Sequence, residues 1–136
     1  DCAEYTVDLP TGDRLLVLVN HFKSKGFGSQ ALSNAKRLRQ ATRVRAIYDQ
    51  RRAEGAELVA VVGDLNETPD GAPLVPLLHA GSDLIDVMDH QAFVGDGRPG
   101  THGNGTKAGK LDYILMSPEL AGRVTAAGIE RRGVWG

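Results

Sequence analysis

The chain has 136 residues, enough for one domain with a buried core, and 41% of them are hydrophobic while 24% are charged, which is typical of a globular protein. The formal net charge of −1 excludes a global positive field, so a polyanion would have to be bound by a local group of residues. No run approaches the ~18 apolar residues of a membrane span. Cys2 has no second cysteine to pair with, which excludes an internal disulfide.

The first third of the chain predicts two antiparallel strands. Residues 5–9 alternate between apolar and polar side chains, which indicates a half-exposed strand, and residues 10–13 have the composition of a turn. Residues 14–22 are nearly continuous Leu and Val and predict a buried strand. His21, Lys23 and Lys25 come at its end, so an imidazole and two ammonium groups are expected beside a core strand.

A long helix is predicted over residues 29–54, ended by Gly55. One face of this helix is apolar and the rest is strongly basic. A basic face is typical either of a nucleic-acid groove or of a solvated outer face. The lack of interleaved aromatic residues favours the solvated face. The apolar positions recur every three or four residues and are Ala31, Ala35, Leu38, Ala41, Val44 and Ile47.

Residues 58–62 predict a buried strand that is bounded by Gly63 and followed by Asp64 and Asn66. Residues two apart in an extended segment point to the same side, so a carboxylate and an amide converge past the end of the strand. A hard cation prefers the carboxylate, and a phosphate oxygen beside it can accept a hydrogen bond from the amide. The alternative is a strand-to-helix turn in which both side chains only satisfy backbone donors.

A short helix is predicted over residues 72–80, capped by Thr68 or Asp70. Residues 82–89 fit either a short strand or a turn. Residues 93–109 are rich in Gly and predict a long loop, and such loops are often functional. Thr101-His102 is the pair in this loop whose side chains could take part in chemistry, whereas His79 and His90 are interpreted as structural or surface residues.

Residues 111–116 predict a further strand, in which Leu111, Tyr113 and Leu115 face one way and Asp112 faces the other with its apolar neighbours. A carboxylate inside such a strand needs a partner, because an unpaired buried charge is costly. The partner is expected either at a functional site or in a structural salt bridge. Residues 124–131 predict a last strand.

Three stretches occur in this order at the ends of core strands: Asn20-His21-Phe22-Lys23-Ser24-Lys25, Gly63-Asp64-Leu65-Asn66 and Lys110-Leu111-Asp112-Tyr113-Ile114-Leu115. As an ordered set they resemble the endonuclease/exonuclease/phosphatase superfamily, the group of pancreatic deoxyribonuclease. The form of the first stretch, with residues 33–37 after it, is most similar to the bacterial, often secreted, nuclease-like branch, so a secreted bacterial origin is an expectation. The resemblance covers about residues 7–129.

The resemblance implies an α/β (α+β type) fold, in which residues 1–136 form one partial catalytic domain: half of a four-layered two-sheet sandwich with outer helices and a mixed or antiparallel sheet. The N-terminal half and a closing Ser-Asp-His segment of the family would lie outside this chain. The chain also starts without an initiator Met, so we expect it to belong to something longer.

The resemblance also implies roles for individual residues. His21 would contact the scissile phosphate, Asp64 would orient water or share a metal with an upstream glutamate that is absent here, and Asn66 would bind a phosphate oxygen. Asp112 would orient a histidine that comes late in the family's chain. Nothing firm carries over to the Thr101-His102 loop. The candidate catalytic residues are therefore His21, Asp64, Asn66 and Asp112, and the candidate substrate-binding residues are Asn20, Lys23, Thr101 and His102.

The implied activity is metal-dependent hydrolysis of a phosphodiester, with nucleic acid as the expected substrate and Mg²⁺ as the expected cofactor, Mn²⁺ or Ca²⁺ being alternatives. A phosphomonoesterase or a phospholipid diesterase on the same scaffold remains open, because a fold does not determine a substrate. An inactive module that binds phosphate without turnover also remains open. The residues determine no oligomeric state.

Overall fold

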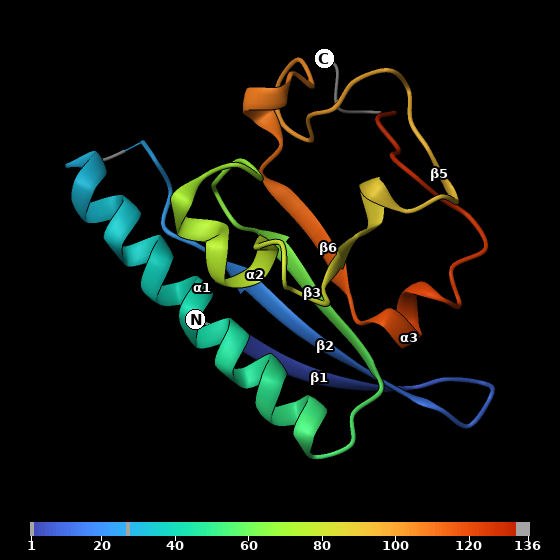
Figure 1. Cartoon of the computed structure of the whole chain (residues 1–136). Helices are drawn as coiled ribbons and strands as arrows, with labels where there is room; N and C mark the ends of the chain where they lie inside the picture. Colours follow the sequence, from blue (N-terminus) through green and yellow to red (C-terminus); the bar gives the residue numbers. More distant parts are fainter. Residues whose placement is uncertain (1, 27, 133–136) are drawn as a thin grey trace.

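The computed structural model describes residues 2–26 and 28–132, and within these residues a five-stranded mixed sheet forms the centre of the fold (Figure 1). β2 and β3 run parallel, whereas β1 pairs with β2, and β6 pairs with β3 and β4, in the antiparallel sense. This arrangement confirms the expected fold class. In spatial order the strands are β1 (Cys2–Asp8), β2 (Arg14–His21), β3 (Leu58–Asp64), β6 (Asp112–Met116) and β4 (Ile85–Asp86).

Helices, 3₁₀ turns and a small second sheet accompany this central sheet. α1 confirms the long predicted helix, and Gly55, with φ +99°, follows its C-cap as expected. Residues 82–89, left open between strand and turn, form β4 and a 3₁₀ turn. The bounds are α1 (Gln30–Ala53), η1 (Ala72–Leu74), α2 (Val75–Leu78), η2 (Val87–Asp89), η3 (Lys107–Gly109) and α3 (Pro118–Ala121); a small parallel pair joins β5 (Phe93–Val94) to β7 (Ala127–Gly128).

The second helical region departs from the prediction. It is shorter than residues 72–80, and neither Thr68 nor Asp70 caps it, because the Thr68 hydroxyl donates to the Asp70 carboxylate at 2.7 Å instead. Gly71 takes the N-cap position without a side-chain hydrogen bond. Thr68 and Asp70 are thereby left on the surface, beside the loop that leaves β3.

α1 packs on one face of the sheet, and the core lies between them (Figure 1). The predicted apolar stripe is correct only for its C-terminal half, where Ala41, Val44 and Ile47 are buried. In the N-terminal half Leu38 is 43% exposed, while Arg37 is fully buried one position earlier. The buried positions recur at helical spacing, and the prediction missed three of them, two of which are polar. The missed positions are Ser33, Arg37 and Tyr48.

The basic residues of α1 are largely engaged in ion pairs, which fits the solvated interpretation of this helix better than a nucleic-acid groove. Arg45 pairs with Asp49 and Asp83, and Arg51 pairs with Glu4 and Glu54. The guanidinium of Arg52 lies 2.7 Å from Glu119. No helix of the described residues has the length and apolar character that crossing a bilayer requires.

The opposite face of the sheet is apolar and partly exposed, and we call it the outer face. Side chains alternate along each strand, so Leu18 points into the core and Val19 points away from it. The strand register aligns Ala3, Val19, Val62 and Ile114 in one row across this face. Its large exposed members are Tyr5 at 58%, Val7 at 44%, Val19 at 38% and Ile114 at 46%.

The outer face leads to a prediction about residues 1–136 on their own. An exposed apolar patch of this kind drives association, so the wild-type segment is expected to sediment as oligomers or aggregates. Val19→Thr combined with Ile114→Thr should shift it towards monomer. Leu32→Thr is the control, because Leu32 is 72% exposed on α1 and belongs to no such patch. A wild-type segment that sediments as a monomer would contradict the expectation.

Candidate active site

Three of the four predicted catalytic residues form one row across three neighbouring strands. His21 ends β2 and pairs in register with Asp64 at the end of β3, and Asp64 pairs with Asp112 at the start of β6. Each is two residues from a member of the outer face, so all three side chains lie on that side of the sheet. We call His21, Asp64 and Asp112 the polar row.

The geometry within the polar row leaves reactive atoms open to solvent. The His21 Nε2 lies 3.9 Å from Asp64 Oδ2, and the two side chains are 76% and 38% exposed. Asp64 Oδ1 accepts the backbone N–H of Asn66 at 2.9 Å. Asp64 Oδ2 accepts no hydrogen bond from the described residues, so this oxygen is available to a cation or to water.

Gly63 brings β2 and β3 close together immediately before the polar row. It has φ +130°, and a Cβ at this position would lie 1.9 Å from the carbonyl oxygen of Asn20, its partner in register. A side chain here would therefore push the strands apart. Phe22 donates its N–H to Asp64 O at 2.9 Å, which continues the close pairing beyond the end of β2.

The sequence pattern indicated that Asn66 continues an extended segment, but in the structure Asn66 lies in a turn. β3 ends at Asp64, Leu65 is buried, and Asn66 has φ +52°, a left-handed conformation that Asn tolerates well. Its side-chain amide donates to Phe22 O at 3.1 Å. That bond fixes the amide beside the end of β2 and uses one of its two N–H groups, so one is left for a ligand.

Asp112 is exposed and finds its partner in the Gly-rich loop. The Thr101 hydroxyl donates to Asp112 Oδ2 at 2.6 Å. The Thr101 Oγ1 atom in turn accepts the backbone N–H groups of Leu111 at 3.1 Å and Asp112 at 3.0 Å. Thr101 therefore fixes both the carboxylate and the backbone at the start of β6. A structural salt bridge, the alternative that the sequence left open, does not form within the described residues.

The structure does not bring the remaining candidates into the polar row. Asn20 is 4% exposed and its amide donates to Leu18 O at 2.9 Å, so its side chain lies in the sheet interior. Lys23 is half-buried, with its ammonium donating to Ser24 O at 3.2 Å. The exposed His102 ring accepts or donates no hydrogen bond within residues 2–26 and 28–132, while its N–H donates to Gly109 O. His90 bonds Ala121 O, which fits its structural interpretation.

A buried charge cluster under the site was missed by the sequence reading. Glu67 has a side chain only 7% exposed and contacts Lys25 Nζ at 2.5 Å and Arg37 at 3.2 Å. Burial raises the pKa of Glu67, but the hydrogen bonds from Lys25 and from the Thr68 N–H, together with the Lys25 and Arg37 charges, hold that pKa below its usual range. The sequence signal that could have indicated this cluster is Glu67, an acid three residues after Asp64, together with Arg37, a basic residue at a helical position that is spaced four residues from Ala41.

Arg37 connects this cluster to the loop after β2. Its guanidinium donates to Lys23 O at 2.9 Å and to the Asn34 side chain, in addition to Glu67. The loop that carries Lys23 and Lys25 and the loop that carries Asn66 and Glu67 are thus joined to α1 through one buried side chain.

The described residues do not form a metal site by themselves. No group of three or more His, Cys, Asp or Glu side chains is placed to hold a metal ion within residues 2–26 and 28–132. A hard divalent cation takes about six oxygen ligands. The open Oδ2 of Asp64 fits one of these positions, so the remaining ligands would have to come from water, substrate or other segments.

The family profile described as Endonuclease/Exonuclease/phosphatase family matches residues 3–134. The chain belongs to the Endonuclease/Exonuclease/phosphatase family. This confirms the resemblance carried by the three strand-end stretches. The profile covers the polar row and the Gly-rich loop alike. No curated protein sequence matches the chain.

Several solved structures share the fold of this family member. Sphingomyelinase C from Streptomyces griseocarneus is 22% identical, with a TM-score of 0.62 over 87% of this chain and 42% of that one. A family protein from Bacteroides thetaiotaomicron is 16% identical, with a TM-score of 0.58 over 80% of this chain and 37% of that one. A beta toxin mutant from Staphylococcus aureus with bound magnesium ions is 19% identical, with a TM-score of 0.58, covering 84% and 41%.

These likenesses show the fold of the family member. The chain spans about two fifths of the length of the three structures. The activity of a whole protein therefore has to be argued from the residues of the polar row and from what lies beside them.

Proposed function

We propose that this chain contributes half of the catalytic domain of a divalent-metal-dependent phosphodiesterase that acts on nucleic acid. The observation that carries the proposal is the polar row, in which His21, Asp64 and Asp112 stand in register at one end of the sheet. Family membership over residues 3–134 supports hydrolysis of a phosphoester as the reaction class.

Mg²⁺ is the proposed cofactor, and when bound it neutralises charge on the phosphoryl oxygens and on the leaving group. Asp64 would hold it through the open Oδ2, or orient the attacking water with the same oxygen. The bond from the Asn66 N–H to Oδ1 fixes the carboxylate, so Oδ2 keeps one direction. The bound magnesium of the beta toxin structure supports the choice of metal.

His21 and Asn66 are proposed to bind the non-bridging phosphate oxygens, where charge develops during hydrolysis. The exposed imidazole lies beside Asp64, and the Asn66 amide keeps one N–H after bonding Phe22 O. Asp112, held by Thr101, is proposed to orient a further side chain from outside the described residues. Asn20 is not included, because its side chain is buried away from the polar row.

The missing ligands are proposed to come from the segment that covers the outer face. On each strand the polar-row residue lies two positions from Val19, Val62 or Ile114, on the same face of the sheet. A segment packed on these apolar residues would therefore lie next to His21, Asp64 and Asp112. Such a segment can present an acidic metal ligand there. The chain spans about 42% of the sphingomyelinase C structure, which is consistent with a second half of similar size.

A phospholipid diesterase is the second candidate, because one of the similar structures is a sphingomyelinase C. The test of the activity is hydrolysis of plasmid DNA, bis(p-nitrophenyl) phosphate and sphingomyelin by the full-length protein that contains residues 1–136, with Mg²⁺ and with EDTA. DNA and the small diester should be cleaved only with the metal. Preferred cleavage of sphingomyelin would favour the second candidate, and no hydrolysis of any diester would refute both.

His21→Ala in the full-length protein is expected to lower kcat by about 10²-fold, which is the effect of removing one donor to a developing oxyanion. Stability should change little, because the side chain is 76% exposed and its neighbouring acid lies 3.9 Å away. His79→Ala is the control, an exposed histidine whose ring only accepts the Gly81 N–H. If His21→Ala mainly lowers the melting temperature and leaves kcat normal, the proposed role of His21 is wrong.

A further inference from the structure

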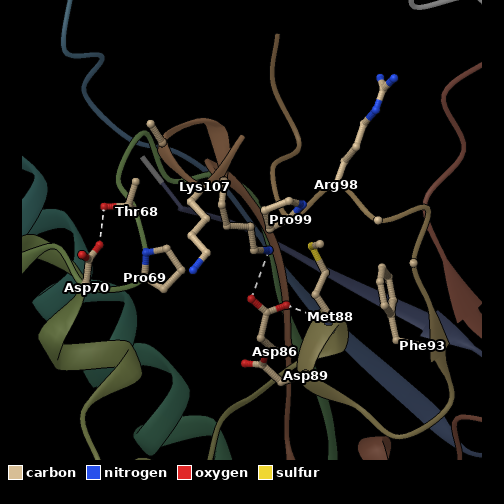
Figure 2. A pocket seen from close by; sticks show the side chains of 14 residues that line it. Thr68, Pro69, Asp70, Asp86, Met88, Asp89, Phe93, Arg98, Pro99 and Lys107 are labelled. Atoms are coloured by element: carbon tan, nitrogen blue, oxygen red, sulfur yellow. Dashed lines mark hydrogen bonds and ion pairs between the residues drawn. The ribbon is translucent and has the colours of Figure 1, made fainter. Parts of the chain in front are cut away.

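A concave region, which we call the side cavity, lies beside the polar row and takes no part in the chemistry described so far (Figure 2). Its volume is about 810 Å³, within the range of about 300–1,000 Å³ that is usual for small-molecule sites. Its walls come from the loop after β3, from η2, from β5 and from η3.

The walls of the side cavity are continuous with the site. Thr68 follows Asn66 by two residues, and Lys110 precedes Asp112 by two. The buried Tyr113 hydroxyl joins these two segments, because it donates to Glu67 O at 2.7 Å and to Lys110 O at 3.2 Å. The Lys110 ammonium also donates to Asp112 O at 2.8 Å. A molecule in the cavity would therefore lie next to a phosphate at the polar row.

One wall offers flat and apolar surface. Phe93, Met88 and Pro99 line it, and Figure 2 shows Met88 and Phe93 side by side beneath Pro99. Next to them Asp86 is neutralised, since its carboxylate lies 3.0 Å from the buried Lys110 ammonium and accepts the Met88 N–H at 3.0 Å. A flat ring can rest on this apolar surface, and aromatic side chains are the usual platforms for nucleobases.

Lys107 supplies positive charge that the protein does not use. Its side chain points into the cavity between Pro69 and Asp86 in Figure 2, and its ammonium has no acidic partner within residues 2–26 and 28–132. At the rim, the Thr68 hydroxyl bonds Asp70 and holds the pKa of that carboxyl below its usual range, so Asp70 is an acceptor at neutral pH. The cavity thus combines a phosphate-binding cation, a stacking surface and an acceptor for amino groups.

We propose that the side cavity binds the nucleotide next to the scissile phosphate of a nucleic-acid strand, with its base against Phe93 and Met88 and its further phosphate on Lys107. This assignment rests on the proposed function and specifies its substrate class. A quaternary ammonium headgroup fits less well, because such cations are bound by cages of several aromatic rings. Among the described residues, Phe93 is the one aromatic ring that lines the cavity, and the Lys107 ammonium would repel a cation.

The test measures binding separately from catalysis. Thymidine 3′,5′-bisphosphate is titrated into the full-length protein in EDTA, which removes the metal, and binding is measured by calorimetry. Phe93→Ala should weaken binding by about tenfold, as loss of one stacked base does. Lys107→Gln should weaken it similarly and lower the slope of log K against log salt by about 1, as loss of one phosphate contact does. The matched controls are Val94→Ala, the 77% exposed neighbour of Phe93 on β5, and Lys36→Gln on α1.

Each result either supports or overturns the assignment. Tighter binding of the nucleotide than of inorganic phosphate, lost in both cavity variants and kept in both controls, supports it. Equal binding of inorganic phosphate, or cavity variants that behave as the controls do, overturns it, and so does binding of phosphocholine that depends on Phe93. Nucleotide binding without metal-dependent hydrolysis would refute the proposed function alone, whereas hydrolysis of DNA without this binding would refute the side cavity alone.

Discussion

Asp64→Asn in the full-length protein is expected to reduce Mg²⁺-dependent hydrolysis of plasmid DNA and bis(p-nitrophenyl) phosphate by about 10²–10⁴-fold, the loss that removal of a positioned acid–base group causes. Asn retains an oxygen that can accept the Asn66 N–H, now at 2.9 Å from Oδ1, so the turn after β3 should persist. The lost negative charge is the one facing solvent and His21 through Oδ2. Asp64→Ala should have at least the same effect on rate.

The control for this prediction is Asp8→Asn. Asp8 is a carboxylate at the opposite end of the sheet, and its ion pair with Arg14 is almost fully exposed. Rates of this variant should equal the wild-type rates, and melting temperatures of all three proteins should agree closely. Asp64→Asn turnover at the wild-type level would show that the carboxylate only supports the turn, which is the alternative that the sequence itself left open.

The polar row could be predicted because its signals are local. Residues 58–62 form an apolar run typical of a buried strand, and Gly63 and Asp64 follow this run directly. His21 lies at the end of another such run. Parallel neighbouring strands then place their carboxyl ends at one edge, which is how β2 and β3 bring these two residues together. The alternation of residues 111–116 also gave the correct side for Asp112 relative to Tyr113.

Other features depended on long-range partners that no local pattern reveals. Asp112 lies in an apolar strand yet is exposed, because the outer face is uncovered at this end. Its partner Thr101 lies eleven positions earlier in the chain. The side cavity draws on four separate segments, and the sequence showed two of them only as part of the Gly-rich loop or its end. Arg37 was assigned to a solvated face, since a cation on a helix is usually exposed unless an acid such as Glu67 meets it inside the fold.

Arg37→Met is expected to lower the free energy of unfolding by about 3–5 kcal/mol, the usual cost of removing one member of a buried ion pair. Arg37 is fully buried and Glu67 is 5% exposed, so loss of the guanidinium leaves the carboxylate with Lys25 as its remaining cation and frees the Lys23 carbonyl. Denaturant unfolding of the full-length protein measures the loss. Arg39→Met is the matched control, an exposed arginine two residues along α1, and should change stability by no more than about 0.5 kcal/mol.

The double variant Arg37→Met/Glu67→Met distinguishes a buried charge pair from simple loss of packing. Replacing both charges by apolar side chains removes the unpaired charge, so much of the single-variant loss should be recovered. The pH dependence gives a second readout: the pKa of Glu67 is lowered on folding, so its stabilisation is present above the ordinary glutamate pKa and is lost as pH falls through the folded value. That acid-side loss should be smaller in the double variant. If Arg37→Met costs no more than Arg39→Met, the cluster does not hold the two loops beside the polar row.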